Sequence, residues 1–250
     1  MANEQIFSGK ANEYAASRPS YAAEAVERIF SAMIREGESA ADVGSGTGIL
    51  SKEFLLRGYD VYCVEPNEAM REKAEAAYGG DVHFHSVAAA AENTGLPVGS
   101  VQLVTVASAF HWFDADAFYT ECERILAPGG VVCILANKRV YDDFTKAQHA
   151  VCEEFCTGFT ALTHGVDKML RRADAFFKGE YHKEAFDFPL HYTKQSFIAR
   201  SISSSYAPEA DTAEYEGYVR ALEALVDAHF DGGDVTIANE TVMLWGRLRG

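Results

Sequence analysis

Basic residues are scarce in this sequence, and it has no long run of apolar residues. Lys and Arg total 22 against 37 Asp and Glu, which gives a formal net charge of −15 at pH 7. A surface this acidic repels the phosphate backbone of nucleic acids, because binding to it depends on clustered Lys and Arg. No apolar run approaches the ~20 residues that a membrane-spanning helix needs. We therefore expect neither nucleic acid nor a membrane as a partner.

The cysteines follow no disulfide pattern. The five cysteines are an odd number without the spacing of a disulfide framework. Cys63 and Cys133 lie in apolar stretches, where a thiol packs like a small hydrophobic side chain. The N-terminal residues lack the basic and then apolar pattern of a signal peptide. These features predict a reduced, cytoplasmic protein.

The sequence does contain the composition and rhythm of an α/β protein. Hydrophobic residues make up 48% of the 250 positions, enough for one large domain or for a domain with an elaborated cap. Apolar stretches predict strands at 39–44, 59–65, 81–87, 101–109 and 129–137. Helical periodicity occurs at Tyr21–Arg35, Ile49–Arg57, Asn67–Tyr78 and Asp114–Leu126. Such alternation predicts a parallel sheet with helices on both faces.

The alternation ends at Asn137. Helical patterns follow at 141–158, 194–204 and 211–230, and further strand candidates are Lys183–Tyr192 and Val235–Leu248. These two strands can close the sheet as an antiparallel pair. The helical part is expected to form a cap over the C-terminal edge of the strands.

The most informative segment is Asp42-Val-Gly-Ser-Gly-Thr-Gly48, at a predicted turn from strand to helix. Its alternate glycines allow positive φ and let a ligand approach the backbone, and the amides that follow can bind polar ligand groups. A dinucleotide-binding loop would have its third glycine where Ile49 stands. A Walker-type loop would need Gly-Lys followed by Ser or Thr. The sequence therefore disfavours the first loop and excludes the second.

A carboxylate stands at the end of the next predicted strand. Glu65 lies 21 residues after Gly44, where it can accept hydrogen bonds from both hydroxyls of a ribose. An adenosine-like ligand without a pyrophosphate suits this pair of features.

Five segments carry a resemblance to a known family: ADVGSGTG (41–48), VYCVEPNEAM (61–70), AAAENTGLP (89–97), SVQLVTVASAFHWFD (100–114) and LAPGGVVCI (126–134). They resemble the motifs of class I S-adenosylmethionine-dependent methyltransferases, in the small-molecule branch called methyltransferase type 11. The resemblance covers residues 5–140 well and the C-terminal third only loosely. Trans-aconitate methyltransferases are the nearest named activity in that branch.

The resemblance implies S-adenosyl-L-methionine as the cofactor. The cofactor-binding residues it implies are Gly44, Ser45, Gly46, Thr47, Gly48, Glu65, Pro66, Met70, Ala90, Ala91, Glu92 and Ala107. Among them Glu65 would bind the ribose hydroxyls, and Pro66 and Met70 would pack near the adenine. Many relatives carry Asp where this chain has Ala90, so a side-chain bond to the adenine amino group is not implied. The backbone of Ala91 can still contact the adenine.

The acceptor side is harder to identify, because a sulfonium methyl donor needs alignment and exclusion of water more than it needs a base. His111 follows the fourth strand, at the edge where doubly wound folds bind ligands. It is the candidate catalytic residue, either as a base or as the anchor of a loop under the cofactor. Candidate substrate-binding residues are Tyr14, Arg18, Trp112, Arg200 and Tyr206.

One helical face can also present a small group of metal-ligand types. His149, Cys152 and Cys156 lie at offsets of three and seven residues. A structural zinc site needs a fourth ligand, and no pattern places His164 there. We expect these cysteines to pack under the cap and expect no metal.

Taken together, these features predict an α/β, Rossmann-like domain with a seven-stranded, mostly parallel sheet. Its expected parts are an N-terminal lid (1–36), a cofactor-binding core (37–137), a cap (138–230) and a closing strand (231–250). The expected function is methyl transfer to a small-molecule acceptor. Two alternatives stay open: a non-catalytic S-adenosylmethionine-binding protein and a nicotinamide-dependent oxidoreductase.

Overall fold

The computed structural model describes residues 20–248, apart from 163, 179, 205 and 232–233. The chain divides into two compact units. The first comprises residues up to 137 together with 167–186 and 241–250, and the second comprises 138–166 and 187–240. Residues 167–186, which the sequence analysis assigned to the cap, thus group with the core.

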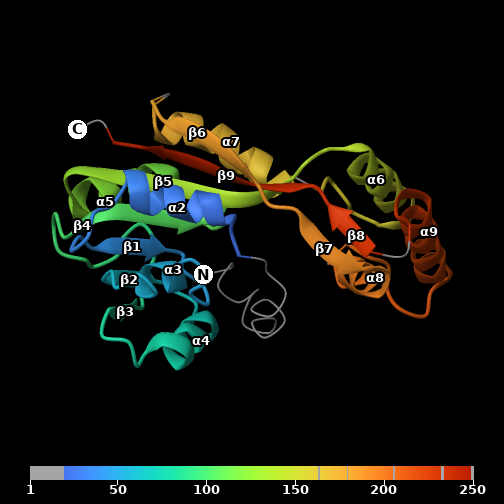
Figure 1. The fold of residues 1–250 in the computed structure, drawn as a ribbon, viewed down its shortest axis with the longest axis horizontal. Coiled ribbons are helices and arrows are strands. Elements are labelled where there is room, and N and C mark those ends of the chain that lie inside the picture. The colour runs from blue at the N-terminus through green and yellow to red at the C-terminus, as the bar shows by residue number, and fades with distance from the viewer. Residues whose placement is uncertain (1–19, 163, 179, 205, 232–233, 249–250) are drawn as a thin grey trace. The chain divides into compact units, whose positions relative to one another are not determined.

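A seven-stranded sheet forms the first unit, in the order β3-β2-β1-β4-β5-β9-β6 (Figure 1). Its strands are β1 (Ala40–Val43), β2 (Val61–Val64), β3 (Phe84–Val87), β4 (Val101–Ala107), β5 (Leu126–Arg139), β6 (His182–Asp187) and β9 (Asn239–Gly246). The neighbouring strands from β3 to β5 all pair in parallel. The predicted fold class is therefore confirmed.

Two of the predicted strands are each interrupted. The stretch Lys183–Tyr192 forms β6 and then β7 (Leu190–Thr193), because Pro189 has no amide hydrogen to continue the ladder. The stretch Val235–Leu248 forms β8 (Asp234–Ile237) and then β9. The antiparallel pair is consequently β7 with β8, in a separate two-stranded sheet, whereas β6 and β9 extend the large sheet.

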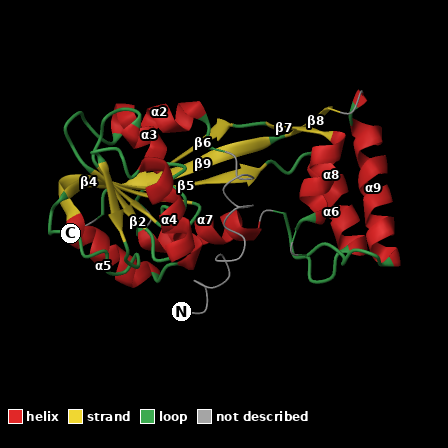
Figure 2. Ribbon diagram, turned by 90° about the horizontal axis from the view of Figure 1, so that it is seen from below, coloured by secondary structure: helices red, strands yellow, loops and turns green. Residues whose placement is uncertain are grey.

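Helices cover both faces of the large sheet: α2 (Ala23–Ala32) and α3 (Ser51–Leu55) lie on one face, α5 (Ala115–Ile125) and α7 (His164–Phe176) on the other (Figure 2). α4 (Glu68–Tyr78) follows β2 and is capped by Asn67, whose side chain accepts a hydrogen bond from the Met70 amide. Asp114 caps α5 in the same way. These caps fix where the helices begin after the strand ends.

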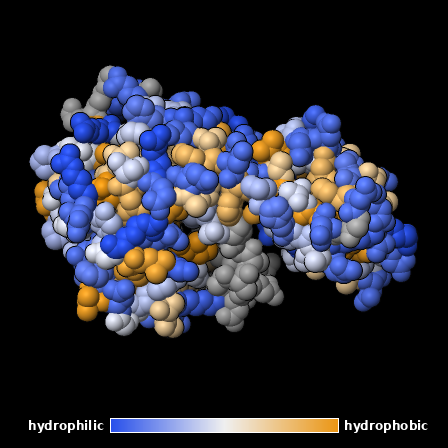
Figure 3. Space-filling view, in the orientation of Figure 1, coloured by the Kyte–Doolittle hydropathy of each residue, from blue (hydrophilic) through white to orange (hydrophobic). Residues whose placement is uncertain are grey.

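The second unit packs three helices with the β7–β8 ribbon. They are α6 (Asp143–Phe155), α8 (Lys194–Ile202) and α9 (Ala213–His229), of which α6 and α9 lie side by side (Figure 2). Its apolar core includes Phe144, Phe197, Tyr218, Leu222 and Val226, all at most 5% exposed. Hydrophilic residues predominate on the face of the unit seen in Figure 3. Within the described part of the chain, no helix is long and apolar enough to cross a membrane.

Candidate cofactor-binding site

The glycine loop between β1 and α3 has the backbone conformation that its sequence predicts. Gly44, Gly46 and Gly48 have φ angles of 70°, 58° and 81°, in the left-handed region that favours glycine. A Cβ on Gly44 would lie 2.5 Å from the Cβ of Ala109, and one on Gly48 would lie 2.7 Å from the Tyr78 ring. A Cβ on Gly46 would approach no atom closer than 3.7 Å. Gly44 and Gly48 are thus required by packing, whereas the space beside Gly46 is left open.

A pocket with an empty volume of about 900 Å³, which includes open solvent at its mouth, lies against this loop. Its lining is Tyr21, Gly44, Ser45, Gly46, Thr47, Ile49, Leu50, Glu65, Pro66, Asn67, Met70, Ala107, Ser108, Ala109, Trp112 and Phe113. The structure thus brings together most residues that the resemblance assigns to the cofactor. Gly48 and the segment Ala90–Glu92 are not part of this lining.

Glu65, at the end of β2, is held by the loop it faces. Its Oε2 accepts the Gly46 amide at 2.9 Å, and its Oε1 accepts the Asn67 amide at 2.8 Å. The residue is only 8% exposed. Burial raises the pKa of Glu65, and the two backbone hydrogen bonds offset part of that rise. A carboxylate thus lies fixed in the pocket, with lone pairs left for further donors.

Asp42 supports the loop from behind the pocket. It is 0% exposed, and its two oxygens accept hydrogen bonds from Ser51 Oγ at 2.6 Å and from Thr105 Oγ1 at 3.0 Å. The bonds connect β1 to the start of α3 and to β4. Burial raises the pKa of Asp42 to about 6, despite these hydrogen bonds.

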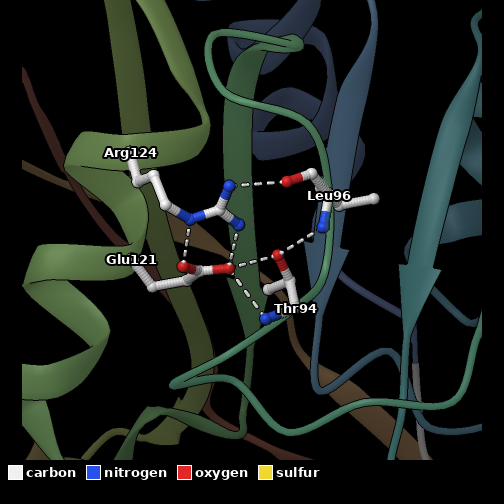
Figure 4. A network of polar contacts seen from close by, with 4 residues as sticks. All are labelled: Thr94, Leu96, Glu121 and Arg124. Atoms are coloured by element: carbon white, nitrogen blue, oxygen red, sulfur yellow. Dashed lines mark hydrogen bonds and ion pairs between the residues drawn. The ribbon is translucent and has the colours of Figure 1, made fainter.

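The segment that follows Ala90–Glu92 is anchored to α5 by the polar network of Figure 4. The Thr94 amide donates to Glu121 Oε1 at 2.7 Å, and Arg124 donates both to Glu121 and to the Leu96 carbonyl. Burial disfavours the charged form of Glu121, but the bonds from Arg124 and Thr94 outweigh it and lower the pKa of the carboxyl. This network holds the loop after the predicted adenine-edge segment.

His111 lies in a 3₁₀ turn (Phe110–Trp112) after β4 and is not part of the pocket lining. Its carbonyl accepts a hydrogen bond from Arg172 at 2.8 Å, and Arg172 also donates to the Phe113 carbonyl. The guanidinium lies 5.4 Å from the centroid of the Phe110 ring. Helix α7 therefore holds this turn through its backbone, which favours the anchoring role among the two predicted for His111.

The other predicted acceptor-side residues are distributed over the chain. Trp112 lines the pocket and is 46% exposed. Tyr14 and Arg18 lie outside the described residues. Arg200 lies in α8 and Tyr206 follows it, so both belong to the second unit. Across the described ranges, no cluster of His, Cys, Asp or Glu has the arrangement of a metal site.

Sequence reasoning did not assign several pocket residues to the site, among them Tyr21, Asn67 and Ser108. Asn67 was detectable, because an Asn before a helical pattern signals a cap. Ser108 was not: its φ of 58° is unusual for a non-glycine residue. Its hydroxyl lies 3.2 Å from that of Tyr21. Backbone strain of this kind concentrates at functional sites.

Comparison with known proteins gives a consistent result. The family described as "Methyltransferase domain" matches residues 41–134. An uncharacterized methyltransferase of Mycobacterium tuberculosis is 35% identical over 53% of this chain and 52% of its own length. The chain thus spans about half the length of the first curated relatives it matches.

Two solved structures share the fold. A "Putative Type II Methyltransferase" from Anaeromyxobacter dehalogenans has a TM-score of 0.66 at 19% identity and covers 93% of this chain and 99% of its own. Phosphoethanolamine N-methyltransferase 2 of Haemonchus contortus, solved with phosphomonomethylethanolamine and S-adenosylhomocysteine, has a TM-score of 0.50 at 14% identity. It covers 91% of this chain and 52% of its own. Residues 41–134 are therefore similar to the methyltransferase domain family, and the two solved structures show that the fold is shared.

Proposed function

We propose that this protein transfers a methyl group from S-adenosylmethionine to a small-molecule acceptor. The observation that carries the proposal is the position of Glu65, which the Gly46 and Asn67 amides fix inside the pocket. A carboxylate held in this way can accept hydrogen bonds from two ribose hydroxyls. The glycine loop next to it lacks the G-x-G-x-x-G motif of pyrophosphate-binding loops, since Ile49 stands at the position of the third glycine.

Two further features of the pocket fit this cofactor. The Ser45 hydroxyl is buried and has no hydrogen-bond partner among the residues that the structure describes, so a polar ligand group can satisfy it. The space beside Gly46 is not used by the protein's own packing. Pro66 and Met70 supply apolar surface in the same pocket. When bound, the cofactor supplies a sulfonium whose methyl group is already activated for displacement.

The residues of this chain would then align the acceptor and exclude water. Trp112 and Phe113 form an aromatic part of the lining, and Tyr21 and Ser108 provide hydroxyl groups there. We propose His111 as the anchor of this turn. The ligands of the Haemonchus contortus structure support the same cofactor and a small acceptor. The five free thiols support action in a reducing cytoplasm.

The proposal is tested first by calorimetric titration with S-adenosylhomocysteine, S-adenosylmethionine and NAD. We expect the first two ligands to bind and NAD not to bind. Binding of NAD alone would instead support the oxidoreductase alternative. Labelled S-adenosylmethionine is then incubated with a panel of small acids, amines, phenols and thiols. Cofactor binding without methyl transfer to any of them would favour the non-catalytic binding protein.

A further inference from the structure

The second unit contains a cationic cluster, although the chain as a whole has a net charge of −15. The cluster consists of Arg139 at the end of β5, Arg200 in α8, and the side chains of Tyr192 and Tyr206. Burial lowers the pKa of Arg139, and the nearby guanidinium of Arg200 lowers it as well. Two like charges beside an apolar core repel each other more strongly than they would in water.

Arg139 is bonded to an uncharged partner. Its Nη1 donates to Oε1 of Gln148 in α6, a side chain that is only 3% exposed. None of the ion pairs formed between described residues involves Arg139. Arg139 is half-buried, and its guanidinium has five N–H donors. Most of its hydrogen-bonding capacity is thus not used within the described part of the chain.

Two buried polar groups on the segments that adjoin Arg139 also lack a hydrogen-bond partner among the described residues. Thr145 lies three positions before Gln148, on the same face of α6, and it is 0% exposed. Asn239 follows Ala238, whose carbonyl accepts the amide of Val140, the residue next to Arg139. Thr145 Oγ1 and Asn239 Nδ2 have no hydrogen-bond partner among the described residues. Buried polar atoms of this kind call for a ligand or ordered water.

The two tyrosines complete the cluster with hydroxyl groups. Their rings pack against the apolar core of the unit, and Arg200 lies 5.7 Å from the centroid of the Tyr192 ring. Tyr192 and Tyr206 act to raise the pKa of Arg139, whereas burial and Arg200 lower it. The cluster therefore combines two guanidinium groups with O–H donors at the edge of an apolar core.

We propose that Arg139, together with Arg200, Tyr192 and Tyr206, binds the carboxylate or phosphate of a small molecule. Planar guanidinium groups match the oxygens of both anions in two-pronged hydrogen bonds. The anion would offset the repulsion between the two arginines and accept hydrogen bonds from the donors of Arg139 that Gln148 leaves unused. This inference concerns binding to the second unit and holds whether or not the protein transfers methyl groups.

The test uses the full chain and calorimetric titration with inorganic phosphate and, separately, with citrate at constant ionic strength. Arg139→Gln should weaken binding by about 10- to 100-fold, the usual cost of losing hydrogen bonds to a charged group. Arg200→Gln changes an exposed side chain and should also weaken binding without affecting the fold. Arg220→Gln is the matched control, because Arg220 is an exposed arginine of α9 paired with Glu216.

Each outcome decides the proposal. Binding of phosphate alone assigns a phosphate ligand, binding of citrate alone assigns a carboxylate, and binding of both supports the shared chemistry. No binding of either probe to the wild type, or an equal loss in Arg220→Gln, would overturn it. If Arg139→Gln does not fold, Arg200→Gln and Tyr206→Phe decide instead. Titration of the same samples with S-adenosylhomocysteine separates a failure here from a failure of the proposed function.

Discussion

In the first unit, two buried carboxylates beside the glycine loop accept hydrogen bonds from the fold around them. Asp42 is bonded to two hydroxyls, and Glu65 is bonded to the amides of Gly46 and Asn67. In the second unit, the guanidinium of Arg139 is half-buried, and its hydrogen-bond partner is the neutral Gln148. One unit thus supplies fixed acceptors, and the other supplies unused donors.

This difference indicates what each unit can recognise. A carboxylate with remaining lone pairs binds donors such as the hydroxyls of a sugar. A guanidinium with remaining N–H groups binds acceptors such as oxyanions. The proposed ligands differ accordingly, a cofactor with a ribose at Glu65 and an anion at Arg139.

Gly46→Val should abolish cofactor binding, with a loss of more than about 100-fold. The valine would occupy the space beside the loop at a φ of 58°, which is strained for any residue with a Cβ. Titration with S-adenosylhomocysteine measures the loss. Gly58→Val is the control: Gly58 has a φ of 72° with nothing near its Cβ position and lies outside the pocket lining. It should suffer the same strain and still bind, and wild-type affinity in Gly46→Val would refute the glycine-loop argument.

Asp42→Asn should change how stability depends on pH. The pKa of Asp42 is raised from 3.8 to about 6, so between these values the folded state binds more protons here than the unfolded state. The free energy of unfolding therefore falls as pH rises through this window, by on the order of 3 kcal/mol.

The asparagine is neutral at every pH and escapes this loss. Urea unfolding of both proteins from about pH 4.5 to about pH 7.5 should show the wild type losing stability relative to the variant. Parallel curves for the two proteins would show that Asp42 is ionised in the folded state at low pH.

The core of the fold and the loop were predictable because their signals are local. The glycines of 44–48 require positive φ by their own chemistry, and short apolar strands alternate with helical patterns through the first 137 residues. The strand pattern from β1 to β5 and the fold class are confirmed by the sheet order. Local patterns could not predict which distant segments pack into the same unit.

Three features show this limit. Helix α7 was missed, and residues 167–186 belong to the first unit because contacts such as Arg172 to the His111 carbonyl hold them there. Ser108 has a positive φ without being glycine. Arg139 lies at the end of a strand, and its neighbours Gln148 and Tyr206 come from elsewhere in the sequence. The surroundings of Arg139 depend on packing between separate segments, so no local sequence pattern predicts them.

Glu65→Ala should weaken S-adenosylhomocysteine binding by about 10- to 100-fold, because a charged acceptor for two hydroxyls is lost, at about 1.5–3 kcal/mol. The affinity of the wild type should also fall as the pH is lowered, because the neutral acid is a poorer acceptor. This fall should occur above pH 4.5, the ordinary pKa of Glu, since burial raises the pKa of Glu65. Glu65→Gln should remove that pH dependence. Glu72→Ala, an exposed change in α4, is the control, and unchanged affinity in Glu65→Ala would show that the ribose binds elsewhere.

The smallest effect is expected at the turn that contains His111. Arg172→Ala removes hydrogen bonds to the carbonyls of His111 and Phe113, which should cost about 1 kcal/mol of stability. Phe113 lines the pocket, so affinity for S-adenosylhomocysteine should fall with the melting temperature by only a few fold. Arg171→Ala changes the exposed neighbour in α7 and should alter neither quantity.

His111→Ala separates the two roles of the histidine. As an anchor, His111 acts through its backbone carbonyl, which alanine retains, so the variant should turn over an identified acceptor within a few fold of wild type at every pH. As a base, its loss would lower turnover by about 10²–10⁴-fold. Part of that loss would return as pH rises, because an acceptor that ionises by itself needs no base. Recovery with pH would therefore overturn the anchoring role, whereas a small, pH-independent change would leave Arg172 and His111 as parts of one support for the pocket wall.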